Sequence, residues 1–435
     1  MNMNDTQTGN KDIKMLYKVL IAAAMGNFIE WFDFAIYGYL AIILSKLFFP
    51  ESSGSIGLIK VFAVFAVAFA LRPIGAIIFG IFGDHAGRKR ALIISIVLMA
   101  TATTIIGILP IYDQIGIMAP VLLSLARCLQ GLSAGGEYAG ACTYVMEHAP
   151  SHQRGKYGSY IPVSTFAAFA LAAIFTYALS RNLSHEQMLA WGWRIPFLMA
   201  APLGLIGLYI RLSLNETPAF RALEAEHKQA HAPLRDALTS QWARMLQLGA
   251  FISLTALAFY TFTTYFTIYM QVVGHLSRTQ SLFVTILAMS FAAIVCPLFG
   301  FFTDYVGRRV SIITASLLLI VLIYPALSLT KYSSVPLAIL GILLLALSAV
   351  LANVVTAVLL SESFPTRVRY TASAVTYNVA YALFGGTAPL VATWLISLTG
   401  DKISPLFYII AIALLGLVGG TMLPETSRIS LVEKT

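Results

Sequence analysis

Two stretches of the sequence repeat one pattern, GIFGDHAGRKR at residues 80–90 and GFFTDYVGRRV at residues 300–310. Both contain the motif G-x-x-x-D-x-x-G-R-[KR]. A second motif, E-x-x-P-x-x-x-R, follows each of them in the same order, at residues 147–154 and again at 362–369. Two motifs repeated in one order at nearly one spacing indicate that a single structural unit occurs twice in the chain.

The composition shows what kind of unit is repeated. Hydrophobic residues make up 58% of the chain and charged residues only 11%, whereas soluble domains carry roughly 25% charged residues. A helix needs about 20 apolar residues to cross about 30 Å of hydrocarbon. Stretches of this length occur at 16–48, 56–82, 91–110, 115–146, 157–180, 191–213, 242–272, 280–302, 311–330, 335–361, 371–398 and 404–423. The sequence therefore predicts twelve membrane-spanning helices.

A polar, charged segment separates the sixth predicted helix from the seventh. It spans residues 214–240 and begins with NETP, which is echoed by LPETSR after the twelfth helix. We expect it to be a partly helical cytoplasmic linker. The predicted fold is an all-α membrane protein with two pseudo-symmetric six-helix bundles, at residues 1–213 and 241–435.

The basic residues predict the orientation of the helices. Lys and Arg concentrate in the loops on one side, from Arg88, Lys89 and Arg90 to Arg211 and Arg367, and such loops face the cytoplasm. Both termini are therefore expected inside. This bias also accounts for the net charge of +9, so we expect no nucleic-acid partner. The polar N-terminus lacks a signal-peptide pattern, and the first helix is expected to be a retained anchor.

Several motifs resemble those of known transporters. The loops at 84–89 and 304–309 resemble the signature loops of the major facilitator superfamily. Segments similar to the metabolite–proton symporter family are GNFIEWFDFAIYGYLA (26–41), RPIGAIIFGIFGDHAGRKR (72–90), LQGLSAGGEYAGA (129–141) and WGWRIPF (191–197). The resemblance runs essentially end to end. It implies the major facilitator fold, a bacterial inner membrane and proton-coupled uptake.

Within that family the substrate signals diverge. FYTFTTY (259–265) is most similar to 2-oxoglutarate permeases, and residues 384–405 are most similar to the citrate and tricarboxylate branch. The first helix and GGEY (135–138) are closer to the proline/betaine and 2-oxoglutarate members. The chain ends soon after the last helix, without the coiled-coil tail of some osmosensing members, and in this respect it departs from those members.

Ionisable residues inside the predicted helices are candidates for proton coupling. A charged side chain at a helix centre costs about 2.5–3.5 kcal/mol on insertion scales, and burial favours the neutral form of an acid. Glu30, Asp33 and Glu137 are therefore expected to take up and release the proton. The alternative is that an acid forms a permanent ion pair with Arg72 or Arg127.

Arg127 is the expected anchor for an anionic substrate group, because a guanidinium can bind a carboxylate through two hydrogen bonds. Its alternative is a fixed pair with an acid. The other predicted substrate-binding residues are Tyr37, Arg72, Gln130, Tyr138, Tyr260, Tyr265, Tyr377, Asn378 and Tyr381. For the aromatic residues the alternative is ordinary packing between helices.

The repeated loops predict a cytoplasmic gate. Their charged residues are Asp84, Arg88, Glu147, Arg154, Asp304, Arg308, Glu362 and Arg369. Ion pairs among partly solvated groups contribute on the order of 1 kcal/mol each, which suits a latch that opens and closes. The alternative is that these residues only shape the turns.

The sequence carries no motif that is typical of an enzyme. The sequence contains no Walker loop, and its three cysteines (Cys128, Cys142 and Cys296) and its scattered histidines have no metal-binding spacing. We expect a protein that is not an enzyme, needs no cofactor or metal and works as a monomer in the lipid bilayer.

The favoured function is alternating-access symport of protons with a small carboxylate resembling 2-oxoglutarate or citrate. The first alternative is proton symport of proline or a betaine-like zwitterion. A membrane sensor or channel is the alternative from a different class.

Overall fold

The computed structural model describes residues 3–50, 54–226 and 230–431, and every regular element in these ranges is a helix. Before the linker these are α1 (Met3–Tyr39), α2 (Ala41–Phe48), α3 (Gly54–Ala86), α4 (Arg88–Ile108), α5 (Tyr112–Ile115), α6 (Met118–Met146), η1 (Ser151–Gln153), α7 (Arg154–Gly158), α8 (Tyr160–Asn182), α9 (His185–Gln187), η2 (Met188–Gly192), α10 (Arg194–Leu198) and α11 (Ala200–Leu212).

The remaining elements are α12 (Pro218–Ala225), α13 (Pro233–Ser240), α14 (Trp242–Tyr260), η3 (Thr261–Tyr265), α15 (Phe266–Val272), α16 (Arg278–Val306), α17 (Arg308–Thr330), α18 (Val335–Glu362), α19 (Arg369–Ala380), η4 (Tyr381–Gly385), α20 (Ala388–Thr399) and α21 (Pro405–Thr421). The predicted linker contains α12 and α13, and its residues 227–229 lie outside the described residues.

Each of the twelve predicted spans is formed by one helix or by a run of successive helices. Within the described residues, nine helical segments are long and apolar enough to cross a membrane. The other three spans are α6, the run α19–η4–α20, and α21. The first two carry many polar residues of the site described below, and α21 is short, with 17 residues. The predicted all-α, twelve-helix fold is therefore confirmed.

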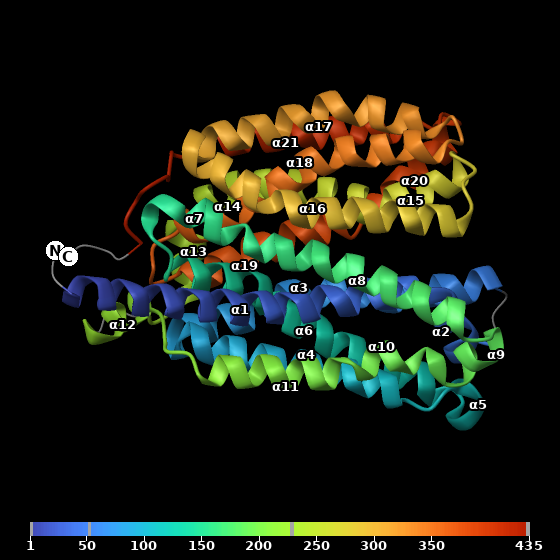
Figure 1. The fold of residues 1–435 in the computed structure, drawn as a ribbon, viewed down its shortest axis with the longest axis horizontal. Coiled ribbons are helices and arrows are strands. Elements are labelled where there is room, and N and C mark those ends of the chain that lie inside the picture. Colours follow the sequence, from blue (N-terminus) through green and yellow to red (C-terminus); the bar gives the residue numbers. More distant parts are fainter. Residues whose placement is uncertain (1–2, 51–53, 227–229, 432–435) are drawn as a thin grey trace.

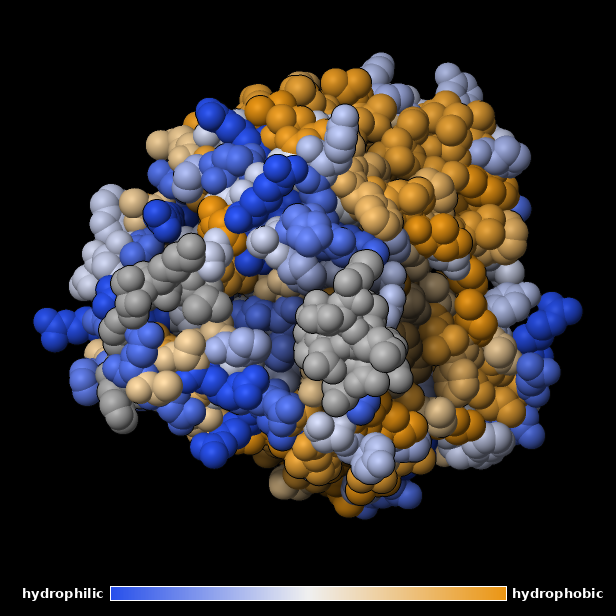
Figure 2. All heavy atoms as spheres, turned by 60° about the vertical axis from the view of Figure 1, so that its left-hand side comes forward, coloured by the Kyte–Doolittle hydropathy of each residue, from blue (hydrophilic) through white to orange (hydrophobic). Residues whose placement is uncertain are grey.

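The long helices lie side by side, as Figure 1 shows. Helices α16, α17, α18, α20 and α21 gather along one side, and α1, α3, α4, α6, α8, α10 and α11 along the other. We call the end of the bundle at which α1 begins the terminal end, and the opposite end, near α5 and α9, the far end. Hydrophilic residues concentrate on the terminal end and apolar residues cover the flank beside it (Figure 2), as expected for a protein that crosses a membrane.

Glycines let α3 and α6 pack backbone against backbone. A Cβ atom on Gly131 would collide with the backbone of Ala68, and one on Gly135 with the backbone of Arg72. Small residues commonly allow such close approach between membrane helices. This contact fixes Arg72 of α3 beside α6.

A substitution at Gly131 should therefore destabilise the protein. Gly131→Ala is expected to lower the free energy of unfolding by about 1–3 kcal/mol, because overpacking forces the helices apart. Gly38→Ala is the matched control, since a Cβ at Gly38 meets nothing within 4 Å; it is expected to be neutral or slightly stabilising. Thermal unfolding in detergent measures both, and equal melting temperatures for the two variants would contradict the packing account.

Candidate functional site

A buried ion pair lies at the junction of the two halves. Arg72 Nη2 of α3 is 2.8 Å from Glu30 Oε1 of α1, and both side chains are 0% exposed. The sequence left their pairing open as the alternative to proton coupling. The pair is present, and the proton-carrying role of Glu30 stays a prediction.

Asn378 connects this pair to the second half of the chain. Arg72 Nε donates to Asn378 Oδ1 (3.0 Å), and Asn378 Nδ2 donates to the carbonyl oxygen of Gly135 (2.7 Å). The amide of α19 thus lies between α3 and α6. A movement of the second half relative to the first therefore changes the contacts of Arg72.

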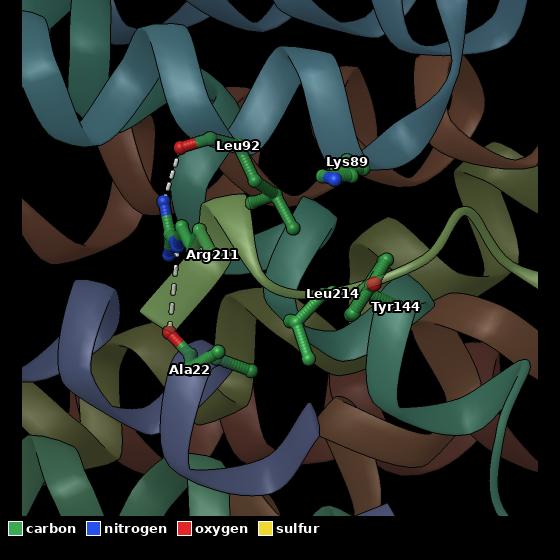
Figure 3. A pocket seen from close by; sticks show the side chains of 7 residues that line it. Ala22, Lys89, Leu92, Tyr144, Arg211 and Leu214 are labelled. Atoms are coloured by element: carbon green, nitrogen blue, oxygen red, sulfur yellow. Dashed lines mark hydrogen bonds between the residues drawn. The ribbon is translucent and has the colours of Figure 1, made fainter. Parts of the chain in front are cut away.

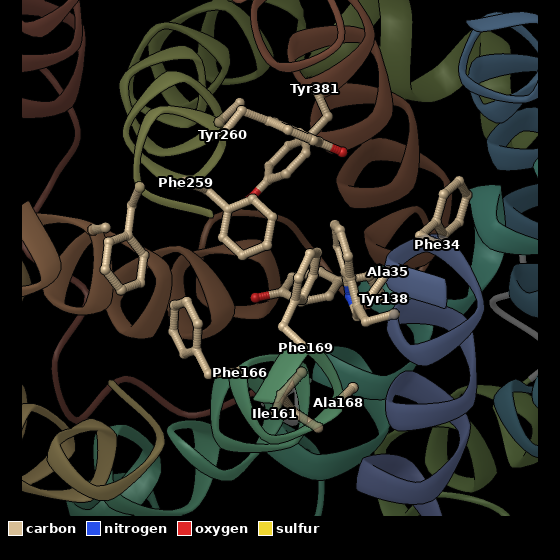
Figure 4. Packing of buried hydrophobic residues seen from close by; sticks show 14 of the residues in the cluster. Phe34, Ala35, Tyr138, Ile161, Phe166, Ala168, Phe169, Phe259, Tyr260 and Tyr381 are labelled. Atoms are coloured by element: carbon tan, nitrogen blue, oxygen red, sulfur yellow. The ribbon is translucent and has the colours of Figure 1, made fainter. Parts of the chain in front are cut away.

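Aromatic rings from both halves surround the pair. The Arg72 guanidinium carbon lies 5.6, 5.4 and 5.6 Å from the ring centres of Trp31, Phe34 and Phe69, within the range of cation–π attraction. The Trp31 ring also contacts Phe259 of the second half, with the ring centres 5.0 Å apart. Figure 4 shows Phe34, Phe169, Phe259, Tyr260 and Tyr381 converging from different helices.

Two π-helical turns hold the tyrosines of the second half. Tyr260 directly precedes the turn η3, and Tyr381 begins the turn η4. Tyr377 stacks on Tyr138 of α6 (4.4 Å between ring centres, 7° between planes), and its ring lies tilted against that of Tyr381 (4.1 Å between ring centres). Single π turns inside α-helices occur frequently at functional sites. Sequence analysis named these tyrosines but predicted neither turn.

Several polar atoms at this junction have no hydrogen-bond partner among the described residues. They include Glu30 Oε2, Arg72 Nη1 and the hydroxyl groups of Tyr138 and Tyr260. An unpaired buried polar group costs about 1–3 kcal/mol. A small ligand with charged groups could satisfy these atoms, so the junction is the candidate substrate site.

A second buried pair lies one turn further along α1. Arg127 Nη1 is 2.7 Å from Asp33 Oδ2 and donates to Gln130 Oε1 (2.6 Å). The Arg127 guanidinium carbon lies 3.8 Å from the ring centre of Tyr37. Arg127 is therefore engaged by an acid, which is the alternative that sequence analysis left open. Its role as the substrate anchor stays a prediction.

Tyr265 lies apart from the central group. Its ring packs against Tyr269, with the ring centres 5.9 Å apart. Of the predicted substrate residues, the structure brings Arg72, Tyr138, Tyr260, Tyr377, Asn378 and Tyr381 together, and it places Tyr37, Arg127 and Gln130 in the neighbouring pair.

The third acid, Glu137, pairs with a residue that sequence analysis misplaced. Arg211 was assigned to a cytoplasmic loop, but its side chain is 2% exposed and binds the Glu137 carboxylate through Nη1 (3.1 Å) and Nη2. Arg211 lies one residue before the end of α11, so its side chain can turn into the bundle. The number of basic residues in each loop does not indicate whether such a side chain points to solvent or into the bundle.

The eight predicted gate residues meet at the terminal end in a symmetric arrangement. Asp84 accepts hydrogen bonds from the backbone N–H groups of Tyr370 (3.2 Å) and Thr371 (2.9 Å) at the start of α19. Asp304 accepts the equivalent bonds from Gly155 (2.7 Å) and Lys156 (2.8 Å) at the start of α7. Each aspartate thus caps a helix of the opposite half, where free N–H groups favour a carboxylate.

Ion pairs reinforce these caps. Glu147 contacts Arg369 (2.6 Å) and Arg88 (3.7 Å), and Glu362 contacts Arg308 (3.0 Å) and Arg154 (3.4 Å). The 147–154 and 362–369 motifs therefore pair with each other across the halves, since Glu147 binds Arg369 and Glu362 binds Arg154. We call these eight residues the terminal latch. Their gating role stays a prediction.

Two further acids hold the latch in place. Glu216 accepts hydrogen bonds from the N–H groups of Arg88 and Lys89 (both 3.1 Å), and Glu425 accepts them from Arg308 and Arg309 (both 3.0 Å). Burial raises the pKa of Glu216. Burial also acts to raise that of Glu425, but the N–H donors outweigh it and the pKa lies below its ordinary value. Glu216 lies in NETP and Glu425 in the similar LPETSR, but the sequence did not predict what either residue does.

The latch should respond to acid through Glu147. Burial alone raises the pKa of Glu147, but the charges of Arg88 and Arg369 outweigh burial and hold the pKa below its ordinary value of 4.5. A lowered pKa in the folded state gives stability that is present above pH 4.5 and lost as the pH falls through the lowered pKa.

Glu147→Gln is therefore expected to lower the melting temperature by a constant amount between about pH 6 and pH 8, and by less below pH 4.5. Thermal unfolding across this range measures the difference. Glu186→Gln, at an exposed position of α9, is the control. A Glu147 effect that grows on acidification would contradict the ion-pair account.

No group of three or more His, Cys, Asp or Glu residues in the described part of the chain could hold a metal ion. Cys142 and Cys296 are free and buried, and Cys128 is free and partly buried.

Known proteins share both the sequence and the fold. The family model described as "Sugar (and other) transporter" matches residues 19–435. The proline/betaine transporter of Salmonella typhimurium is 37% identical over 425 residues, covering 95% of this chain and 84% of the relative. The glycine betaine/proline/ectoine/pipecolic acid transporter OusA of Dickeya dadantii has the same identity and coverage.

Among solved structures, the proton:xylose symporter XylE of the major facilitator superfamily, bound to 6-bromo-6-deoxy-D-glucose, has the same fold. The TM-score is 0.78 at 19% identity, over 97% of this chain and 98% of that one.

Proposed function

Since the chain belongs to the sugar (and other) transporter family of the major facilitator superfamily, whose members are transporters and not enzymes, we propose that it couples inward proton movement to uptake of a small zwitterion of the proline or betaine type. The buried Glu30–Arg72 pair at the junction of the halves, ringed by aromatic side chains, is the observation that carries this proposal.

The chemistry of the junction suits a zwitterion. The unpaired Nη1 of Arg72 can bind a carboxylate. The faces of Trp31, Phe259 and Tyr260 can attract a cationic nitrogen, with aromatic cages being a common way to bind quaternary ammonium groups. Both groups are present on proline and on glycine betaine.

The small carboxylate favoured by sequence analysis is less well supported than this alternative. A di- or tricarboxylate needs several cations, but Arg127 is already paired with Asp33 and Arg72 with Glu30. The relatives at 37% identity are also named as proline/betaine transporters or for related zwitterions.

The proposed cycle is alternating access. Residues 1–213 and 241–435 move as two bundles joined by the 214–240 linker, with both termini cytoplasmic in a bacterial inner membrane and the monomer as the working unit. In this cycle the terminal latch is the cytoplasmic gate in its closed state. A proton on Glu30 would weaken its hold on Arg72, and the freed guanidinium would bind the substrate carboxylate. Because Asn378 of the second half is hydrogen-bonded to Arg72, a movement of the guanidinium would also shift the second half.

Uptake into proteoliposomes with an imposed pH gradient tests the proposal. Labelled proline or glycine betaine is expected to accumulate, and a protonophore is expected to abolish accumulation. Unlabelled 2-oxoglutarate and citrate should not compete. Competition by the carboxylates would restore the first prediction, and accumulation that ignores the pH gradient would exclude proton coupling. If the protein were a channel, labelled substrate would only equilibrate across the membrane, and unlabelled substrate on the opposite side would not accelerate its movement.

A further inference from the structure

The Glu137–Arg211 pair lies outside the substrate site but one helical turn from it. A Cβ atom on Gly26 of α1 would collide with both the Glu137 carboxylate and the Arg211 guanidinium. Gly26 and Glu30 are four residues apart on α1, so they occupy one face about 5–6 Å apart. Asp33 continues the series on the other side of Glu30. The three acids therefore follow α1 turn by turn, with Glu137 nearest the terminal end.

The surroundings of Glu137 give it several polar neighbours. Ser95 of α4 donates to Glu137 Oε2, and Arg211 also donates to the carbonyl oxygens of Leu92 and Ala22 (Nε to Ala22, 3.4 Å). Tyr370 of α19 lies next to it and donates its hydroxyl to the carbonyl oxygen of Gly136 (2.8 Å). The charged groups that face Glu137 are thus Arg211 and, one turn away on α1, Glu30.

A small cavity adjoins Arg211 on the side of the terminal end. It has a volume of about 10 Å³, roughly the space that one water molecule needs. Its lining includes Arg211, Lys89, Tyr144 and Leu214 (Figure 3). Lys89 is the second residue of α4, and Leu214 lies in the loop after α11. A water there would touch the guanidinium from the side that leads to the terminal end.

We propose that Glu137 and Arg211 form the proton-release site of this transporter, separate from the substrate site. This inference rests on the proposed function in that Glu30 supplies the proton. The O–H bond of protonated Glu30 breaks and an O–H bond forms on Glu137, which becomes neutral and loses its ion pair. The attraction of Arg211 for the carboxylate then breaks that bond, and the proton passes to water on the side of the terminal end, where Arg211 lines the cavity. The Glu137–Arg211 pair forms again.

The first test separates proton coupling from substrate movement. The double variant E137Q/R211Q removes both charges, so no unpaired buried charge remains to unfold the protein. It is expected to exchange labelled proline or glycine betaine across the membrane within twofold of wild type. Its accumulation driven by a pH gradient is expected to fall at least tenfold. R211K, which keeps the charge, should accumulate more substrate than R211Q.

Arg194→Gln is the matched control. Arg194 donates to the carbonyl oxygens of Gly107 (3.0 Å) and Leu109 (2.7 Å) near the far end, so its replacement should leave both assays unchanged. Accumulation by E137Q/R211Q equal to wild type would mean that the pair is only structural, and would overturn the inference.

A second test needs no substrate. Infrared spectra of purified R211Q at neutral pH are expected to show the carbonyl band of a protonated carboxyl group that E137Q/R211Q lacks. If wild type accumulates neither proline nor glycine betaine, the proposed function fails, and this band alone decides the inference. Identical spectra for the two variants would overturn the assignment of Arg211 as the group that drives the proton off Glu137.

Discussion

Arg72→Gln is expected to abolish both accumulation and exchange of the substrate, with a fall of at least a hundredfold in either rate. The substitution removes the guanidinium that we propose binds the substrate carboxylate, and it leaves Glu30 as an unpaired buried acid. Breaking a buried pair in this way destabilises a protein by about 3–5 kcal/mol. Transport in proteoliposomes and thermal unfolding in detergent measure the two effects on one preparation.

The double variant Glu30→Gln/Arg72→Gln separates function from folding. It leaves no buried charge, so its melting temperature should recover most of the loss seen in Arg72→Gln. Its transport should not recover, because the proposed anion-binding group and the proposed proton carrier are both absent. A double variant that transports like wild type would show that the pair has a structural role only.

The second large effect is expected at the terminal latch. In Glu147→Gln/Glu362→Gln, both glutamates of the cross-half ion pairs are neutral, and Arg369 and Arg154 lose their acidic partners. The closed terminal face should then open more often. Cys142, fully buried one turn inside the end of α6, is expected to react with N-ethylmaleimide at least tenfold faster. A tenfold change needs about 1.4 kcal/mol, less than one broken buried pair contributes.

The control for this experiment removes a charge elsewhere. Glu186→Gln changes an exposed acid at the far end and should leave the reactivity of Cys142 unchanged. Replacing Cys128 and Cys296 by serine leaves Cys142 as the only cysteine of the chain, so the label reports on the intended residue. Unchanged reactivity in the latch variant would mean that the caps made by Asp84 and Asp304 hold the face closed without the ion pairs.

The fold was predictable because its causes are local in sequence. Each apolar stretch is long enough to predict a helix that crosses the membrane, and the repeated loops indicate that a six-helix unit is duplicated. The residues of the latch were also predictable, since both copies of each motif carry them. Their partners were not. Glu147 pairs with Arg369 and not with Arg154 of its own motif because the two halves face each other at the terminal end, and this arrangement is not encoded in one motif.

The central site was predictable only in part. Arg72 and Glu30 were predictable as site residues because ionisable side chains inside a membrane helix are costly. Whether Trp31 and Phe259 line the site depends on which helix faces meet there, and hydropathy alone does not reveal which faces these are. Arg211 was missed because a basic residue at a helix end can point to solvent or into the bundle, and the sequence pattern is the same in both cases.

The most direct test of the central claim is a measurement of the proton movement that accompanies substrate entry. Proteoliposomes carry a pH-sensitive dye in their lumen, and proline or glycine betaine is added outside with no pH gradient imposed. Wild type is expected to acidify the lumen as labelled substrate enters. Glu30→Gln is expected to exchange substrate without acidification. Substrate entry into wild-type vesicles without acidification, or acidification by Glu30→Gln equal to wild type, would contradict proton coupling through Glu30.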